Sequence, residues 1–153
     1  MIEKYKKIVA QNRKAVFNYF IEERFEAGII LKGSEVKSLR NGKASIEDSH
    51  AASFEQEIIL YNCHIAEYDK AHQFNHLTKR PRKLLLHWQE IKKIIGKIKL
   101  KGYTLIAISL YFNDKNKAKV ELGLAKGKKL HDKRQTLREQ DWKLEQARTK
   151  REK

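Results

Sequence analysis

Apolar and polar positions along most of this chain follow the period of strands rather than that of helices. Runs rich in aromatic and β-branched residues, bounded by polar turn-forming residues, are typical of β-strands. In KAKVELGLA, for example, Val120, Leu122 and Leu124 alternate with Lys119 and Glu121, which predicts a strand with one buried face. The predicted strands are residues 17–31, with a bend near Gly28, and residues 49–54, 58–65, 83–87, 103–112 and 117–125.

A short helix is predicted between the first two strands. Ser34 can cap the two-turn segment EVKSLRNG, and Asn41-Gly42 can end it. Lys37 and Arg40 are three positions apart, so we expect them together on the outer face of this helix.

A second helix is predicted from about Trp88, because apolar residues recur there at helical spacing, with lysines between them, up to Lys101-Gly102. The segment before it is different. Residues 71–82 show no sustained period and contain the only proline, Pro81. This indicates a long loop, and loops of that length in compact domains are usually functional or mobile.

Together these elements predict a mainly β fold. Five or six short antiparallel strands with one or two helices indicate a small closed antiparallel barrel in residues 1–125. The OB-fold is the commonest such barrel with a nucleic-acid role, and we expect it here. SH3-like barrels and small sandwiches have similar patterns and remain open at this point.

The pattern changes after Ala125. Residues 126–153 have a helix-forming composition, but their apolar residues are sparse, with Leu130, Leu137 and Leu144 seven positions apart. These few leucines form an apolar stripe that is too narrow to hold a helix against the body. An isolated helix of this length is only marginally stable in water. We predict a basic C-terminal tail that is disordered alone and becomes helical when a polyanion neutralises its charge.

The net charge of the chain indicates which class of partner it binds. The 153 residues include 34 Lys and Arg against 19 Asp and Glu, a net charge of +15. Such a field attracts polyanions, and nucleic acid is the abundant one in the cytosol. Residues 126–153 hold 11 Lys and Arg and 5 Asp and Glu, about three times the net charge density of the body. We interpret the chain as a nucleic-acid-binding protein, and a merely solvated basic surface is the alternative.

Other protein classes are disfavoured. One cysteine cannot form an intramolecular disulfide framework or a multi-thiolate zinc site. No apolar run approaches the ~20 residues of a membrane helix. The N-terminal MIEKYKKIVAQNRK lacks the apolar stretch of a secretory signal. We therefore expect a cytoplasmic protein with no membrane partner.

No catalytic or metal-binding pattern is apparent. His72 and His76 are four apart, but no glutamate follows His72 as a zinc-protease helix requires. Glu22 and Glu23 would point to opposite faces of a strand, which spoils them as an acid–base pair. Cys63 lies in an apolar run and is expected to be a small core residue. We predict no catalytic residue, no metal and no cofactor.

Two basic clusters suit an RNA partner. KRPRK (79–83) and AKGKKLHDKR (125–134) can contact phosphates without reading sequence. His131 and Trp142 add flat rings that can stack on unpaired bases. Trp142 is equally suited to anchor the tail on the body.

Three strings in the same order and spacing resemble the SsrA-binding protein (SmpB) family: FEAGIILKGSEVKSLRNGKA (25–44), RKLLLH (82–87) and LAKGKKLHDKR (124–134). The resemblance extends from about Asn12 through the tail. Members often carry Asp-Pro after the histidine of the middle loop, whereas Leu77-Thr78 follows here.

The resemblance implies an OB-fold body that binds the tRNA-like domain of transfer-messenger RNA (tmRNA, also called SsrA). It also implies the escort of alanyl-tmRNA, with elongation factor Tu, into stalled ribosomes for trans-translation. The body would occupy space that an anticodon arm would fill. The tail would become a helix in the empty mRNA channel of the small subunit. No catalysis is implied.

The resemblance assigns tmRNA contact to Asn12, Glu26 and Leu85, and reading the residues themselves adds Lys37, Arg40, Arg82 and Lys83 as phosphate contacts. A carboxylate among phosphates is unusual. Glu26 is expected to accept hydrogen bonds from base edges or 2′-hydroxyls, or to hold a neighbouring arginine.

In the tail, the resemblance assigns ribosome and decoding-centre contact to Gly127, Lys128, His131, Asp132, Lys133 and Arg134, and Trp142 is a further candidate. Gly127 is expected to free the backbone at the junction of body and tail. Two other hypotheses stay open. One is a generic ribosomal or structured-RNA-binding OB-fold protein, and the other is an RNA-modifying enzyme that uses Glu26 and a histidine.

Overall fold

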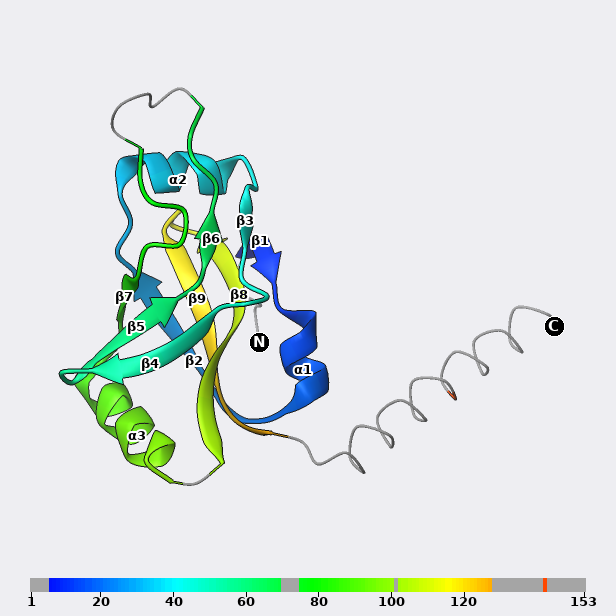
Figure 1. Cartoon of the computed structure of the whole chain (residues 1–153), viewed down its shortest axis with the longest axis vertical. Coiled ribbons are helices and arrows are strands. Elements are labelled where there is room, and N and C mark those ends of the chain that lie inside the picture. Colours follow the sequence, from blue (N-terminus) through cyan, green and yellow to red (C-terminus); the bar gives the residue numbers. More distant parts are fainter. Residues whose placement is uncertain (1–5, 70–74, 101, 128–141, 143–153) are drawn as a thin grey trace.

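Antiparallel strands are the main secondary structure of the described chain (Figure 1). The structure is a computed structural model that describes residues 6–69, 75–100, 102–127 and 142. Its strands are β1 (Lys6–Gln11), β2 (Tyr19–Ile29), β3 (Ala44–Ser45), β4 (His50–Phe54), β5 (Glu57–Tyr61), β6 (His64–Ile65), β7 (Arg82–Leu85), β8 (Tyr103–Asn113) and β9 (Ala118–Gly127). Its helices are α1 (Arg13–Asn18), α2 (Gly33–Arg40) and α3 (Trp88–Ile98).

The main sheet closes on itself. Its strand order is β1-β8-β4-β5-β7-β2-β9, and an additional β8–β9 pairing joins the two ends into a ring, with β1 added at the side of β8. Every pairing is antiparallel. This confirms the predicted mainly β, closed antiparallel architecture. In Figure 1, α2 lies at one end of the barrel and α3 at the other, where β9 also ends.

Alternation along the strands fills the barrel interior. Residues such as Leu60, Leu84, Leu110 and Leu122 are fully buried in one continuous core. Ile94 of α3 is also buried in this core, so the apolar side of α3 packs inward as predicted.

Bulges create a smaller second core on the outside of the barrel. The β2–β9 register shifts between Ile21 and Glu23, and the β8–β9 register shifts between Ala107 and Ser109. A bulge reverses which face the following side chains occupy. As a result, Ile21, Ile106 and Ile108 pack on the outer face beneath Ala15 of α1.

Some elements, and the ends of others, differ from the sequence prediction. β1 and α1 were not predicted, because the pattern of each is short. Ser34 does not cap α2. Its N-cap is Lys32, whose backbone N–H donates to the Glu35 side chain at 2.7 Å. The register break in β2 lies at Glu22, whereas pairing at Gly28 is regular.

The last strand continues beyond the predicted boundary of the body. Gly127 pairs with Tyr19, so residues 126 and 127 belong to the sheet. Gly127 therefore extends β9 rather than forming a loose junction. Residues 71–74 of the predicted 71–82 loop lie outside the described residues. Among the described helices, none is long and apolar enough to cross a membrane.

Candidate nucleic-acid interface

Glu26 lies on the outer face of β2, because its neighbours Phe25 and Ala27 point into the core. The Tyr111 hydroxyl on β8 donates a hydrogen bond to Glu26 Oε2. Burial, and then the hydrogen bond to the Glu26 carboxylate, raise the pKa of Tyr111. The hydroxyl therefore stays protonated and orients the exposed carboxylate, whose Oε1 has no partner among the described residues.

A second carboxylate, Glu121, lies directly opposite Glu26 in the β2–β9 register. Like charges facing each other across strands are destabilising. Here Arg24 Nη1 donates to Glu121 Oε1 at 2.9 Å, and Ser109 Oγ donates to Oε2 at 3.3 Å. The neighbouring Arg24 is thus held by Glu121 and not by Glu26.

A surface hollow of about 310 Å³ adjoins Glu26. Leu85, which is 51% exposed, pairs with Gly28 across the β2–β7 ladder and lines the hollow. A Cβ on Gly28 would lie 3.3 Å from Leu85 Cβ, so glycine allows the leucine to lie close against β2. His87 and Lys119 also line the hollow. With Glu90 also in its lining, the hollow combines an apolar surface, two carboxylates and a cation.

Asn12 is buried, with only 5% of its surface exposed. Its Oδ1 accepts from the Ala15 N–H at 3.2 Å and so caps α1. Its Nδ2 donates to the Ile46 carbonyl at 3.4 Å and the Ala107 carbonyl at 3.3 Å. These bonds favour a positioning role for Asn12, holding β1 and α1 on the barrel, over direct contact with RNA.

Arg82 was wrongly expected to contact phosphate. Strand alternation turns Arg82 and Leu84 inward, and the Arg82 side chain is fully buried. Its Nε donates to Glu35 Oε2 and its Nη1 to the Cys63 carbonyl at 2.6 Å, while Nη2 donates to the Thr78 carbonyl at 3.2 Å. The buried guanidinium is therefore inaccessible to a phosphate.

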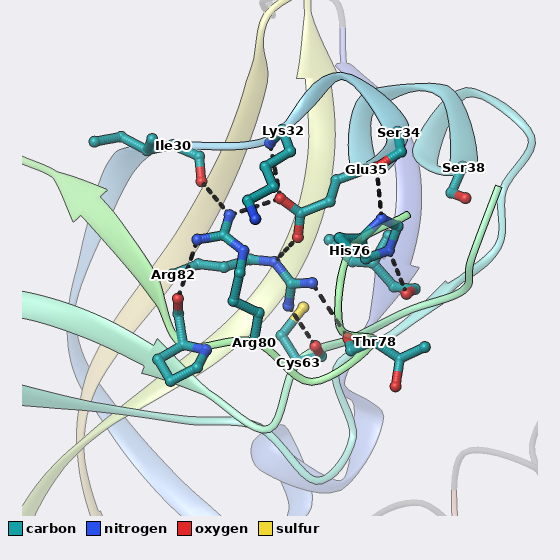
Figure 2. A network of polar contacts seen from close by, with 12 residues as sticks. Ile30, Lys32, Ser34, Glu35, Ser38, Cys63, His76, Thr78, Arg80 and Arg82 are labelled. Atoms are coloured by element: carbon teal, nitrogen blue, oxygen red, sulfur yellow. Dashed lines mark hydrogen bonds and ion pairs between the residues drawn. The ribbon is translucent and has the colours of Figure 1, made fainter. Parts of the chain in front are cut away.

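Figure 2 shows that the Glu35 carboxylate lies between the two guanidinium groups of Arg80 and Arg82. Arg80 Nη2 donates to Glu35 Oε1 at 2.6 Å. Burial alone would raise the pKa of Glu35, but hydrogen bonds from Arg80, the Lys32 backbone and Arg82 outweigh burial and hold that pKa below its usual value. The cluster therefore attaches α2 to β7 and the loop before it.

His76 belongs to this structural cluster and does not form a metal site. It is 2% exposed, and Nε2 donates to the Ile65 carbonyl at 2.9 Å. In the neutral ring, Nδ1 then accepts from Ser34 Oγ, also at 2.9 Å. Cys63 is fully buried, which confirms it as a core residue, and burial raises the pKa of its thiol to about 11. The described part of the chain holds no metal-ligating cluster.

The other predicted phosphate contacts are exposed but lie apart from the hollow. Lys37 and Arg40 share the outer side of α2, with the Lys37 Nζ 5.4 Å from the centroid of the Tyr68 ring. Lys83 on β7 forms a half-exposed ion pair with Glu57 at 2.9 Å. None of the three cations lines the hollow beside Glu26.

The tail residues are only partly described. Lys128, His131, Asp132, Lys133 and Arg134 lie outside the described residues. Trp142 is described as helical and 60% exposed.

Tyr111, the partner of Glu26, was not predicted as a site residue, because it lies within a run of apolar residues. The signal was present in the alternation of Ser109 and Tyr111 with Leu110 and Phe112, which places two hydroxyls on one face. Asn12 before RKAVFN was likewise a recognisable cap for α1.

Comparison with known proteins gives concordant matches. Residues 9–152 match the family model described as SmpB protein. The chain is 72% identical over 149 residues to the SsrA-binding protein of Rickettsia conorii, covering 97% of this chain and 98% of that protein. The SsrA-binding protein of Rickettsia bellii is 71% identical over 149 residues, with 97% and 99% covered.

A solved structure is also similar. It is described as "tmRNA-SmpB: a journey to the center of the bacterial ribosome", and it superposes with a TM-score of 0.66 at 48% sequence identity. The match covers 78% of this chain and 84% of that chain.

Proposed function

The chain belongs to the SmpB protein family, and we propose on this basis that it binds the tRNA-like domain of tmRNA and delivers it to stalled ribosomes for trans-translation. Its relatives are named for binding SsrA, and its structural neighbour is described with tmRNA and the bacterial ribosome. The chain acts as an RNA-binding protein in the cytoplasm and catalyses no reaction itself. Elongation factor Tu with alanyl-tmRNA is an indirect partner.

The observation that best supports this function is the hollow beside Glu26. A protein of net charge +15 gains affinity for any RNA from its lysines and arginines. The hollow adds an oriented carboxylate and the exposed Leu85 side chain, neither of which attracts phosphate. Both suit a splayed base or a ribose, so this face is suited to a structured RNA element rather than to RNA in general.

We assign different tasks to the body and the tail. Glu26 and Leu85 contact tmRNA, Lys37, Arg40 and Lys83 contribute phosphate contacts, and Asn12 positions the outer face. Gly127, Lys128, His131, Asp132, Lys133, Arg134 and Trp142 act on the ribosome, in the decoding centre and the mRNA channel.

Tail truncation tests this division. A chain that ends after Gly127 keeps every strand of the barrel. Its affinity for the tRNA-like domain should change by less than about fivefold, or about 1 kcal/mol, whereas peptide tagging on stalled ribosomes should be lost. Gel-shift titration and an in vitro tagging assay measure the two quantities.

The alternative, a generic RNA-binding OB-fold protein, predicts a different result for the truncated chain. In that case the tail would supply most of the RNA affinity, and its removal would weaken binding to the tRNA-like domain and to unrelated RNA alike. A full-length Glu26→Ala chain is the complementary variant, and Glu22→Ala, which changes another exposed glutamate of β2, is its control. Only the former should lose affinity for the tRNA-like domain.

A further inference from the structure

The solvent-facing side of α3 and its C-cap carry several lysines, and within the described residues 88–100 only Lys93 pairs with a carboxylate. Ile94 and its apolar neighbours pack inward, while Lys92, Lys93 and Lys99 are exposed. Lys93 pairs with Glu23 of β2 at 2.7 Å. Lys92 lies over the ring of Trp88, with its Nζ 5.2 Å from the ring centroid, and Trp88 is itself 51% exposed. This combination of cations and an accessible ring suits an RNA backbone.

Gly96 adds an independent observation. It lies in the interior of α3 on the exposed side, where glycine weakens a helix relative to alanine. A Cβ at Gly96 would meet nothing within 4 Å, so the packing of this chain gives no reason for the missing side chain. Because Gly96 has no side chain, the helix surface is depressed between the lysines. The backbone of a partner can approach the helix closely at that position.

The lysine face is continuous with the start of the tail. Lys97 of α3 and Lys126 of β9 both lie over the ring of Tyr103, with Nζ to centroid distances of 5.2 and 4.6 Å. Lys126 is followed by Gly127, the last residue of β9, and then by residues 128–153. Both elements reach the same end of the barrel, the end opposite α2 (Figure 1).

We propose that this face, formed by Lys92, Lys97, Lys99 and Lys126 around Gly96, binds the phosphate backbone of ribosomal RNA. The proposal rests on the proposed function, in which the tail emerging beside Lys126 enters the ribosome. The tmRNA hollow is lined by His87 and Glu90 where α3 begins, and the Glu90 carboxylate disfavours phosphate. The face therefore serves a second RNA, and it holds the body on the ribosome where the tail begins.

Charge neutralisation tests which RNA is bound. The variant Lys92→Gln/Lys99→Gln removes one cation from α3 and one from its C-cap. The control Lys115→Gln/Lys117→Gln removes two exposed cations from the β8–β9 hairpin, at the α2 end of the barrel (Figure 1). Full-length chains are titrated with vacant ribosomes and, separately, with the tRNA-like domain of tmRNA, over a range of salt.

The α3 variant should lower the log–log salt slope for ribosome binding by up to about 2, roughly 0.9 per lost phosphate contact. Its slope for the tRNA-like domain should match the control. A lower slope for the tRNA-like domain would overturn the proposal and make α3 part of the tmRNA interface. Unchanged slopes on both RNAs would overturn it entirely. Failure of the wild-type chain to bind the tRNA-like domain would instead contradict the proposed function.

A steric test keeps the proposal independent of charge. Gly96→Ala should raise the melting temperature because alanine favours helix. It should weaken ribosome binding by about fivefold or more through the clash with an approaching backbone. Gly33→Ala, at the first residue of α2, is the matched control, because a Cβ there also meets nothing within 4 Å. If Gly96→Ala binds ribosomes as tightly as Gly33→Ala does, close approach at α3 is refuted.

Discussion

At the scale of single residues, the contact between Tyr111 and Glu26 is the detail that gives the outer face its chemistry. An exposed glutamate samples several rotamers, and holding it in one costs conformational entropy when RNA binds. The Tyr111 ring is buried, and its hydroxyl donates to Glu26 Oε2. Lys6 Nζ lies 4.7 Å from the centroid of the same ring. The carboxylate is therefore oriented before RNA arrives.

We accordingly expect Glu26→Gln and Tyr111→Phe to be coupled. Glu26→Gln should weaken binding of the tRNA-like domain by about 1–3 kcal/mol, since charged acceptors form the stronger hydrogen bonds. Tyr111→Phe should weaken it because the carboxylate loses its orienting donor. The double variant should cost less than the sum by about 0.5–3 kcal/mol. Strict additivity in this cycle would show that the tyrosine does not prepare the site.

The sequence alone could not show that Lys83 faces outward whereas Arg82 faces inward. In RKLLLH, cations and leucines each occupy both parities, so the hydrophobic pattern does not decide which side faces inward. The structure turns Arg82 and Leu84 inward and Lys83 and Leu85 outward. The buried Arg82 is stabilised by its ion pair with Glu35. The two residues are 47 positions apart, so no local sequence pattern indicates that they pair.

At the scale of elements, α2 is held by charge rather than by a large apolar face. Leu39 is its one buried apolar side chain among the described residues, next to the buried Glu35 and Ser38. Two guanidinium groups share the Glu35 carboxylate, so the cluster carries a net positive charge. Removing one partner of a buried ion pair usually costs more than the pair itself contributes, because the remaining charge is left unpaired.

This cluster predicts a pH-dependent stability. The pKa of Glu35 in the fold lies below the ordinary value of 4.5, so its contribution to the free energy of unfolding is complete above that pH. The contribution is lost as the pH falls through the lowered value. At neutral pH, Glu35→Gln should lower the free energy of unfolding by about 3–5 kcal/mol. In more acidic solution the difference from the wild type should narrow.

Urea denaturation at neutral pH and below pH 4.5 provides the measurement. Glu57→Gln is the matched control, because Glu57 forms a half-exposed pair with Lys83, and such pairs contribute about 0–1 kcal/mol. A Glu35→Gln penalty that is the same at both pH values would contradict the assignment.

Sequence periodicity predicted the long elements and missed the short ones for a physical reason. The apolar spacing of α3 and the alternation along β9 each persist over several turns or pairs, so chance patterns rarely mimic them. In contrast, α1 has 6 residues and lacks a local apolar stripe of its own. It forms because Asn12 caps it and because bulges in β2 and β8 expose apolar residues beneath it.

At the scale of the whole molecule, RNA affinity has two sources that respond differently to salt. The net charge of +15 supplies attraction to any phosphate backbone, which weakens steeply as added salt reduces the gain from counterion release. The hollow beside Glu26 offers contacts to bases and sugars, which release no counterions. The two contributions should therefore separate in a plot of log affinity against log salt.

Glutamate and lysine substitutions should therefore change the salt dependence of binding to the tRNA-like domain in different ways. Glu26→Gln should lower the affinity at every salt concentration while leaving the slope unchanged. Lys37→Gln should reduce the slope by about 0.9 if that lysine neutralises one phosphate. Asp114→Asn, a change in charge at the exposed β8–β9 turn, controls for net charge alone. A changed slope for Glu26→Gln would mean that the carboxylate acts through the overall field, and the oriented hollow would then have no part in recognition.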